Sequence, residues 1–285
     1  MNKFPFDKDV FVRCMYASCI SVLAESASRF LDIAQALRAN GSLSYADEEA
    51  ENSYSEGVYD SLYDTGRREL LTAFQDHVVA LLADSDSSVR RALLGSITSL
   101  CVFFGRQRSN DFLLSHLITY LNDRDWMLRC AFFESIVGVA TFVGGRSLED
   151  YILPLLSQAI TGRDLCFHEL MLDTEEFVIE KVLNALASLT ELGLFQKSSV
   201  LDLSKTIVKL VVHPNTWVSN GAIGFLATGA KSMGLIDAQS LLYPIFRPYL
   251  QCDISVISEQ KLLDFKQKPV LSLGILADLD SSSCI

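Results

Sequence analysis

The sequence predicts an all-α fold that is built from repeated pairs of helices. The first observation is a turn motif with two aspartates and an arginine, which returns after 129 − 90 = 39 residues. The second is that apolar segments of helical length lie on both sides of such turns. The third is that apolar and polar residues do not alternate at period two, so no strand pattern competes with the helices.

The turn motif is clearest where residues 82–92 are aligned with residues 121–131. The leucine, both aspartates, the arginine and the alanine of the two segments coincide. The same frame fits residues 7–13, and it fits 175–180 and 215–220 more loosely. We interpret the following as structural repeat positions: Asp86, Arg90, Asp125, Trp126, Arg129 and Trp217.

Helices are expected before and after each turn. The expected helices before the turns, called first helices, span 67–83, 111–121, 148–160, 198–212 and 238–250. The expected helices after the turns, called second helices, span 89–104, 126–143, 177–192 and 217–233. Helix pairs that repeat at about 40 residues are typical of HEAT and armadillo proteins. The predicted fold is therefore a HEAT/armadillo-type right-handed α-solenoid over residues 1–270.

Local signals mark the ends of these helices. The glycines at expected helix ends are Gly105, Gly144, Gly193 and Gly234. The aspartate before a second helix suits a helix N-terminus, where free N–H groups favour a carboxylate. The arginine one turn further on is expected to pair with an aspartate of its own or the adjacent repeat. Trp126, Phe177 and Trp217 take equivalent positions in the frame, and we expect them to serve packing.

Three segments depart from the repeat. Residues 41–66 contain seven acidic side chains and no Lys or Arg, which accounts for −7 of the net charge of −11. We interpret residues 41–66 as a flexible, solvated insertion, because they lack the apolar density that a packed segment needs. A second, short insertion is expected near 161–173, and residues 271–285 form a divergent tail.

The composition excludes several classes of protein. With 49% hydrophobic and 21% charged residues, the chain is too apolar to be disordered. Its net charge of −11 is unlike the basic footprint of a nucleic-acid-binding protein. Apolar stretches such as 136–143 are interrupted well short of the ~20 residues that a membrane-spanning helix needs. Seven cysteines without a Cys-x-x-Cys pair indicate free, buried thiols in a reducing compartment, so we expect a cytoplasmic protein.

No group of residues predicts a catalytic site, a cofactor site or a metal site. His77 and His116 are 39 residues apart at one repeat position, so we interpret them as first-helix residues rather than ligands. Cys166 and His168 form a Cys-x-His without a second pair of metal ligands. Residues 221–224, Gly-Ala-Ile-Gly, are expected inside a helix, where small residues permit close packing. The sequence therefore predicts a protein that is not an enzyme and needs no cofactor.

Three blocks, at 121–140, 175–179 and 213–218, are more specific than a generic helical repeat. With them, residues 3–270 resemble the central HEAT-repeat region of the large regulatory subunit of class III phosphatidylinositol 3-kinase, the vacuolar-protein-sorting fifteen family. In that family a kinase-like domain precedes the repeats and a WD40 propeller follows them. This sequence has none of the kinase-like domain's motifs, so the resemblance does not carry kinase activity over.

The resemblance implies a non-catalytic scaffold that holds and activates a lipid kinase in autophagy and in endosomal or vacuolar sorting. The implied partners are the class III lipid-kinase catalytic subunit and its coiled-coil cofactor, with no nucleic acid and no direct membrane insertion. The implied location is cytoplasmic, and peripheral on endosomal or autophagic membranes through the complex. The alternative is a generic HEAT-repeat adaptor, of the phosphatase-scaffold or transport-receptor type. The repeat pattern assigns no partner-binding surface.

Overall fold

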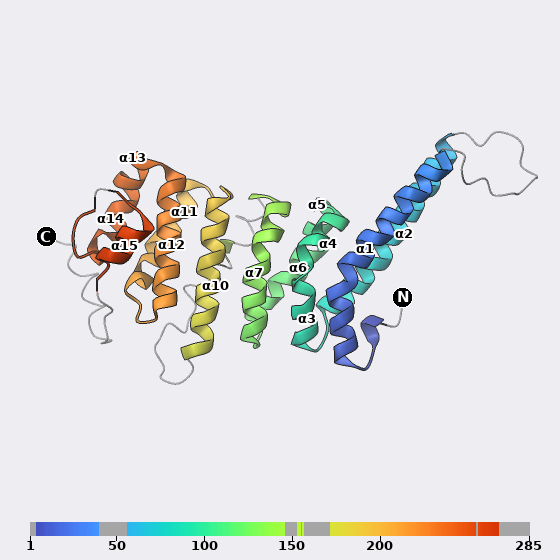
Figure 1. The fold of residues 1–285 in the computed structure, drawn as a ribbon, viewed down its shortest axis with the longest axis horizontal. Coiled ribbons are helices and arrows are strands. Elements are labelled where there is room, and N and C mark those ends of the chain that lie inside the picture. The colour runs from blue at the N-terminus through green and yellow to red at the C-terminus, as the bar shows by residue number, and fades with distance from the viewer. Residues whose placement is uncertain are drawn as a thin grey trace, which may run out of the picture. The chain divides into compact units, whose positions relative to one another are not determined.

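The computed structural model describes residues 4–39, 56–145, 153, 154, 156, 172–254 and 256–267. The chain divides into two compact units, Met1–Tyr120 and Leu121–Ile285. Both units are built from helices (Figure 1).

Unit 1 begins with two long helices and continues with shorter ones. Its elements are η1 (Phe4–Phe6), α1 (Val10–Ala39), α2 (Glu56–Leu82), α3 (Ser87–Leu94), α4 (Ile97–Phe104), α5 (Arg106–Arg108), η2 (Ser109–Leu113), α6 (Leu114–Leu117) and the beginning of η3 (Ile118–Asn122). The segments from α5 to η3 follow one another without a break, and η2 is a π-helical turn. Together they form the one irregular first helix that the sequence predicts near 111–121.

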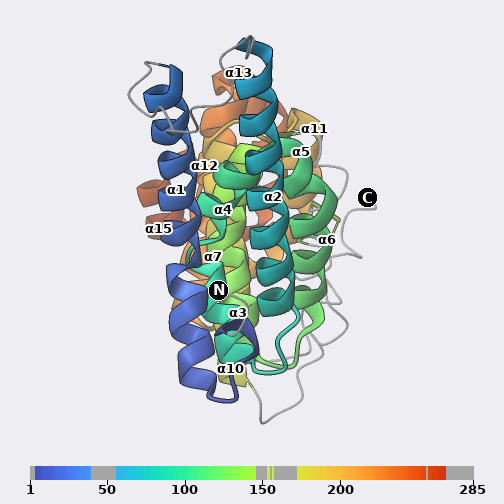
Figure 2. The ribbon, with the colours of Figure 1, turned by 90° about the vertical axis from the view of Figure 1, so that its right-hand side faces the viewer.

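In unit 1, α1 lies side by side with α2 and packs against α3 and α4 (Figure 2). The face of α1 that makes these contacts carries small and aliphatic side chains. Ala17, Ile20 and Ala24 on this face are fully buried. Small side chains allow the helix axes to approach closely, and the buried apolar area stabilises the unit.

The second helix that we expected at 89–104 is broken in the structure. α3 ends and α4 begins on either side of Gly95 and Ser96. The Ser96 hydroxyl donates to the carbonyl of Leu93 at 3.2 Å and to the carbonyl of Ala17 in α1 at 3.4 Å. Glycine has a poor helix propensity, and a serine hydroxyl that bonds to the backbone competes with the helix ladder. The prediction of one continuous helix was wrong here.

Unit 2 contains three long second helices. Its elements are α7 (Trp126–Val143), α10 (Leu172–Glu191), α11 (Lys197–Ile207), η5 (Val208–Val212), α12 (Thr216–Met233), α13 (Leu235–Asp237), η6 (Ala238–Leu242), α14 (Tyr243–Phe246), η7 (Arg247–Tyr249) and α15 (Glu259–Phe265). Two continuous runs, 197–212 and 235–249, are the first helices that the sequence predicts at 198–212 and 238–250.

α10 packs against α7 on one side and α12 on the other. Its side chains Val182, Leu183, Leu186 and Leu189 are fully buried between these helices. A Cβ added to Gly221 of α12 would lie 3.2 Å from the Cβ of Leu183. The expectation that a small residue permits close helix packing here is therefore confirmed for Gly221.

Four glycines close helices in a backbone conformation that other residues rarely adopt. They are Gly105 (φ 80°), Gly144 (φ 98°), Gly193 (φ 69°) and Gly234 (φ 87°). Without a Cβ, glycine reaches positive φ at little cost, and it is therefore enriched after the last turn of a helix. The prediction of helix ends at these four glycines is confirmed.

The structure corrects the predicted boundary of the acidic insertion. α2 begins at Glu56, so residues 56–66 are helical and the prediction of a flexible segment up to 66 was wrong for them. The Tyr63 hydroxyl donates to Asp32 of α1 at 2.5 Å, and an added Cβ on Gly66 would lie 3.4 Å from Leu31. The length of α1 gives this part of α2 a surface on which to pack.

The remaining irregular segments fall largely outside the described residues. Residues 41–55 and the tail 271–285 are not among them. The same holds for most of the insertion near 161–173, although α10 begins at Leu172 and so takes up its last two residues. The five described cysteines are free thiols, as the sequence predicts: Cys14, Cys19, Cys101, Cys130 and Cys252. Cys19 and Cys252 are exposed, so the prediction that the thiols are buried was wrong for these two.

The described part of the chain contains no β-strand. It has one isolated antiparallel bridge, between Leu250 and Lys266. Helix pairs account for both units, so the prediction of an all-α fold of the HEAT/armadillo solenoid type is confirmed.

Two helices, α1 and α7, are longer and more apolar than we expected from the sequence. The segments Val10–Leu37 of α1 and Trp126–Val143 of α7 are long and apolar enough to cross a membrane, so the prediction that every apolar stretch is too short was wrong. Of the apolar segment, 44% is buried inside the protein in α7 and 28% in α1. A core helix passes the same test of length and composition, and the packing of α7 against α10 accounts for its hydrophobicity.

Candidate interaction surface

The second helices α3 and α7 begin at turns in which carboxylates bond to the backbone. The Asp84 carboxylate accepts from the N–H of Asp86 at 2.9 Å, and the Asp86 carboxylate accepts from the N–H of Ser88 at 2.8 Å. Asp123 and Asp125 repeat both bonds, at 2.9 Å each. The first N–H groups of a helix have no hydrogen-bond acceptor within the helix, and these carboxylates act as the acceptors. Asp86 and Asp125 are therefore N-caps, as their positions in the repeat predict.

The arginine of the frame folds back over its own turn. Nη1 of Arg13, Arg90 and Arg129 donates to the carbonyl six residues earlier, at 2.7, 2.5 and 2.6 Å respectively. For Arg129 the acceptor is the main-chain carbonyl of Asp123, an aspartate of its own repeat. The arginine thus holds the loop that leads into the second helix.

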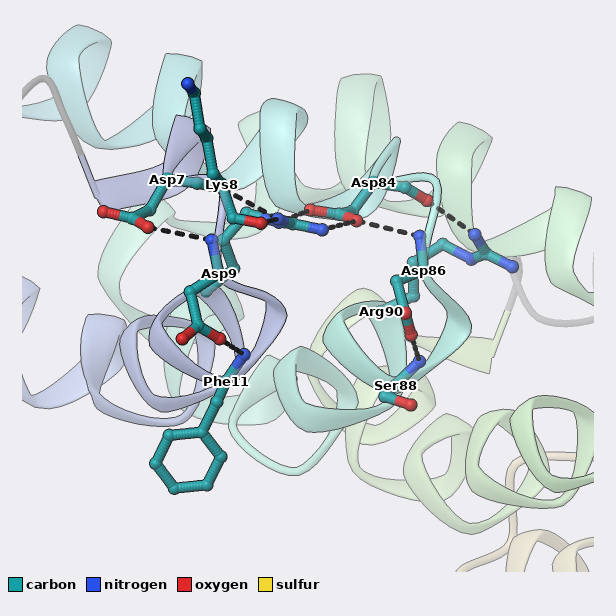
Figure 3. Close-up of polar contacts among 9 residues, drawn as sticks. Asp7, Lys8, Asp9, Phe11, Asp84, Asp86, Ser88 and Arg90 are labelled. Atoms are coloured by element: carbon teal, nitrogen blue, oxygen red, sulfur yellow. Dashed lines mark hydrogen bonds and ion pairs between the residues drawn. The ribbon is translucent and has the colours of Figure 1, made fainter.

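Arg13 also bonds to the turn of the next repeat. Its Nε and Nη2 donate to the two carboxylate oxygens of Asp84, at 2.7 and 3.1 Å. The two side chains are only 12% and 6% exposed. Figure 3 shows the turn of Asp7 to Asp9 on one side of this contact and the turn of Asp84 to Asp86 on the other. The adjacent-repeat ion pair that the sequence predicts is confirmed for Arg13.

The pKa of Asp84 reflects these contacts. Burial acts to raise the pKa of this carboxyl, but the hydrogen bonds from Arg13 and from the N–H of Asp86 outweigh burial and hold the pKa below its ordinary value. A bidentate guanidinium–carboxylate pair fixes direction as well as distance. The contact therefore sets the relation between the start of α1 and the start of α3.

A serine stands in place of the arginine at the turn before α12. Asn215 caps α12 by accepting from the N–H of Trp217 at 2.8 Å, and Ser219 lies four residues after the cap, as Arg90 does after Asp86. The Ser219 hydroxyl donates to the carbonyl of Val211 at 2.6 Å, and it accepts from Nζ of Lys266 at 2.8 Å. The cation at this turn therefore comes from 47 residues further along the chain.

The caps show that Trp126 and Trp217 are not equivalent, contrary to the prediction. Trp126 is the first residue after its cap Asp125, whereas Trp217 is the second after Asn215. The frame also fails at 175–180, because α10 begins earlier, at Leu172. The alignment is ambiguous at these two turns, because the first has glutamates and the second an asparagine in place of the two aspartates.

The three aromatic residues of the frame nevertheless contact one another. Trp126 stacks on Phe177 with 5.9 Å between ring centroids, and Phe177 meets Trp217 at 5.2 Å. Trp126, Phe177 and Trp217 are called the aromatic row. The row joins α7, α10 and α12 near their N-terminal ends. The expected packing role is confirmed for these ring contacts.

The aromatic row also faces solvent. Trp217 is 55% exposed, and Met127, which shares the second position after a cap, is 45% exposed. Apolar side chains gathered on a protein surface are typical of interaction sites, where tryptophan and methionine are enriched. The aromatic row together with Met127 is the candidate interaction surface of unit 2, and the sequence had assigned no such surface.

The histidines have structural surroundings. His77 is buried in α2 with its Nδ1 2.6 Å from the Tyr16 hydroxyl oxygen, and burial lowers its pKa. His116 in α6 has its Nδ1 2.8 Å from the carbonyl oxygen of Phe112. Both lie in first helices, as predicted. Among the described residues no three His, Cys, Asp or Glu side chains are placed to hold a metal ion. Cys166 and His168 lie outside those residues.

The fold and its turns define the class of this protein. In unit 2 the second helices α7, α10 and α12 pack against one another in order. Carboxylate and arginine side chains fix the turns that precede α3 and α7. These are the features of a helical-repeat protein of the HEAT type, a class that presents extended surfaces to other proteins. The family model described as "PIK3R4-like, middle domain" matches residues 1–272, and the chain belongs to this family.

Several proteins named as vps15 kinases are similar to this chain. The serine/threonine-protein kinase vps15 of Schizosaccharomyces pombe is 46% identical over 98% of this chain and 16% of its own length. The Saccharomyces cerevisiae VPS15 is 38% identical over 86% of this chain and 15% of its own length. The VPS15 of Arabidopsis thaliana is 32% identical over 95% of this chain and 18% of its own length. The chain therefore spans less than a fifth of the length of these relatives, and it corresponds to a helical-repeat region rather than a kinase domain.

Two solved structures are similar to this chain at low sequence identity. A designed armadillo repeat protein is 15% identical over 75% of this chain and 95% of its own, with a TM-score of 0.42. A TOG domain of Crescerin, from an array that regulates microtubules in the primary cilium, is 16% identical over 76% of this chain and 92% of its own, with a TM-score of 0.39.

Proposed function

We propose that this chain is a non-catalytic protein-interaction scaffold of the class III phosphatidylinositol 3-kinase complex. The observation that carries this proposal is the match of residues 1–272 to the middle domain of the PIK3R4-like family. The relatives are named as kinases, but the part of them that this chain resembles is the helical repeat. The role of such a segment is to bind and position other proteins.

The surface of unit 2 supports a binding role. Caps and ring contacts hold Met127 and Trp217 at the beginnings of their helices. Because this backbone is already ordered, a partner that covers both side chains gains apolar burial at a small cost in conformational entropy. Tryptophan is among the residues that dominate binding energies at protein interfaces.

The expected partners are the class III lipid-kinase catalytic subunit and its coiled-coil cofactor. Through them the chain serves autophagy and endosomal or vacuolar sorting, in the cytoplasm and at the periphery of endosomal or autophagic membranes. The family membership of the chain favours this function over a generic HEAT-repeat adaptor of the phosphatase-scaffold or transport-receptor type.

Affinity purification from native cells, followed by mass spectrometry, tests the identity of the partners. The chain is expected to enrich class III lipid-kinase subunits, and a Met127→Ser/Trp217→Ser variant is expected to lose them. A Leu235→Ser/Ile236→Ser variant is the matched control, because these side chains are also highly exposed but lie in α13. Enrichment of a phosphatase or of transport cargo in place of the lipid kinase would support the generic adaptor.

A further inference from the structure

The turn before α12 differs from the turns before α1, α3 and α7 in its first hydrogen-bond acceptor. In those three turns an aspartate carboxylate accepts from the N–H two residues later, at 2.9 Å for each of Asp7, Asp84 and Asp123. At the turn before α12, Nδ1 of His213 accepts from the N–H of Asn215 at 3.1 Å. A histidine therefore takes the place of the first aspartate.

This exchange of acceptor makes the turn before α12 sensitive to pH. A carboxylate accepts hydrogen bonds down to about its pKa, ~4 for aspartate. An imidazole nitrogen accepts only in the neutral ring, because both nitrogens of the charged ring carry a proton, and the ordinary pKa of histidine is about 6.5. Mild acid therefore removes a histidine acceptor and leaves aspartate acceptors in place.

The charge on a protonated His213 has a second group to bind, the Glu176 carboxylate of α10. Burial lowers the pKa of His213, and Glu176 acts to raise it. Glu176 also accepts from the side-chain amide of Asn215, the cap of α12. A charged His213 is attracted to this carboxylate and competes with Asn215 for it. Protonation therefore weakens both contacts of Asn215, the one to the His213 ring and the one to Glu176.

The other charged groups around the turn leave this competition unchanged. Among the described residues, Glu176 is the only charged side chain that acts on the pKa of His213. Nζ of Lys266, which follows α15, donates to the Ser219 hydroxyl, and this hydroxyl donates to the carbonyl of Val211. The bond between Ser219 and Val211 contains no group that titrates in mild acid, so the base of the turn stays closed. Other charged side chains on the elements that pack on η5 and α12 form ion pairs of their own: Asp202 with Lys205, Lys197 with Asp237, and Arg247 with Asp253.

We propose that residues 213–219 form a pH-sensitive turn: neutral His213 closes it, and protonation moves the ring from the N–H of Asn215 to the carboxylate of Glu176 and opens it. The proton comes from solvent and binds Nδ1, the atom that accepts in the closed turn. In the turns before α1, α3 and α7 the acceptor is a carboxylate, so the response is confined to this one of the four turns.

The consequence of opening is a change in the position of Trp217. Asn215 caps α12 by accepting from the N–H of Trp217, and the Trp217 ring meets Phe177 at 5.2 Å. Because Trp217 belongs to the candidate interaction surface, we expect mild acid to weaken the binding of a partner there. This last consequence rests on the proposed function, whereas the pH-sensitive turn is a property of the chain alone and is tested without a partner.

Hydrogen–deuterium exchange of the full chain at pH 7.5 and pH 5.0, resolved to single residues and corrected for the intrinsic exchange rate at each pH, tests the proposal. We expect the protection of the N–H groups of Asn215 and Trp217 to fall about fivefold or more at pH 5.0, because each loses a hydrogen bond. The N–H groups of Asp125 and Met127 are the control within the same sample, since their acceptors are carboxylates. Their protection should change by less than about twofold.

Two substitutions at one position separate the acceptor from the charge. His213→Asn supplies a neutral acceptor that does not titrate, in the turn that an asparagine side chain favours, so the protection should be equal at both pH values. His213→Phe keeps a ring but has no acceptor, so the protection should be low at both. Far-UV circular dichroism should match the parent chain in both variants, because the bond of Ser219 to Val211 remains.

Tryptophan fluorescence follows the ring itself. Trp126→Phe leaves Trp217 as the one tryptophan of the chain. Its emission should change with the same pH midpoint as the exchange data, and the addition of His213→Asn should remove that change. An emission that stays constant from pH 7.5 to 5.0 would mean that Trp217 keeps its place, and would overturn the proposal.

Three exchange results would also overturn it. The first is a parent chain in which Asn215 and Trp217 keep their protection at pH 5.0. The second is an equal loss of protection in the parent chain and in His213→Asn, because the histidine would then not be the cause. The third is an equal loss at Asp125 and Met127, because acid would then loosen the protein generally.

Discussion

Arg13 and Asp84 join two turns that are separated by 71 residues in the chain. The guanidinium of Arg13 binds both carboxylate oxygens of Asp84 and also holds the carbonyl of Asp7 in its own turn. Asp84 in turn accepts from the N–H of Asp86, the cap of α3. One ion pair therefore links the start of one second helix to the start of the next.

Substitution of Asp84 tests this link. Asp84→Asn keeps the shape of the side chain but removes its charge and one of its two acceptor oxygens from Arg13. We expect the free energy of unfolding to fall by about 1–3 kcal/mol, the range for a charge-assisted hydrogen bond in a partly buried site. Chemical denaturation of the purified chain measures the change.

The matched control for this experiment is Asp76→Asn, which changes an exposed carboxylate of α2. Its effect should stay within about 0.5 kcal/mol, as is usual for exposed charges. Equal effects of the two substitutions would contradict a structural role for the pair of Arg13 and Asp84.

The sequence predicted the parts of the fold that depend on local signals. Asp86 and Asp125 were recognised as caps, and Gly105 and Gly144 as helix ends, because each acts within one turn of its own position. The break in the helix at Gly95 and Ser96 was missed, because a glycine and a serine inside an apolar helical pattern do not by themselves show that the helix stops there, and the bond from Ser96 to Ala17 forms only in the folded chain.

The candidate site shows the same division between local and distant information. The aromatic residues could be picked out from the sequence, but their contacts across three helices and the exposure of Trp217 could not. Lys266 was missed altogether, because it reaches Ser219 from a separate element and has no place in the repeat.

A pair of glycines in α12 separates packing from helix propensity. Gly221→Ala places a methyl group 3.2 Å from the Cβ of buried Leu183, so we expect a loss of about 1–3 kcal/mol in stability from overpacking. Gly224→Ala meets no atom within 4 Å and should gain up to about 1 kcal/mol from better helix propensity. Thermal unfolding of both variants checks the signs. A gain for Gly221→Ala would mean that α10 and α12 are not in close contact there.

Cysteine reactivity tests the packing of unit 1. Burial raises the pKa of Cys101 to about 11, partly offset by a hydrogen bond with Ser109. At pH 8 only about one Cys101 in a thousand is therefore ionised, and the thiolate is the reactive form. Cys19 and Cys252 are exposed and should react with a maleimide first. Peptide mass spectrometry at timed intervals measures the order, and labelling of Cys101 as fast as Cys252 would contradict the burial of α4.

Two histidines predict how stability depends on pH. Burial lowers the pKa of His77 and of His213 in the folded protein. Between the folded pKa and the unfolded value of about 6.5, the unfolded chain binds more protons. The free energy of unfolding should therefore be highest above pH 6.5 and fall as the pH is lowered toward the folded pKa values. Urea denaturation between pH 7.5 and 5 measures this, and His77→Gln/His213→Gln should flatten the dependence. If the free energy of unfolding of the double variant had the same slope against pH as the parent chain, the two histidines would not be its cause.

In the function that we propose, this chain binds class III lipid-kinase subunits without itself catalysing a reaction. The most direct test is titration of the purified chain against the purified catalytic subunit and coiled-coil cofactor by biolayer interferometry, with ATP turnover of the chain alone measured in parallel. We expect saturable binding at micromolar concentrations and no turnover of ATP. The binding should be weakened at least tenfold by Met127→Ser/Trp217→Ser but not by Leu235→Ser/Ile236→Ser. Absence of binding at these concentrations, or ATP hydrolysis by the chain alone, would contradict it.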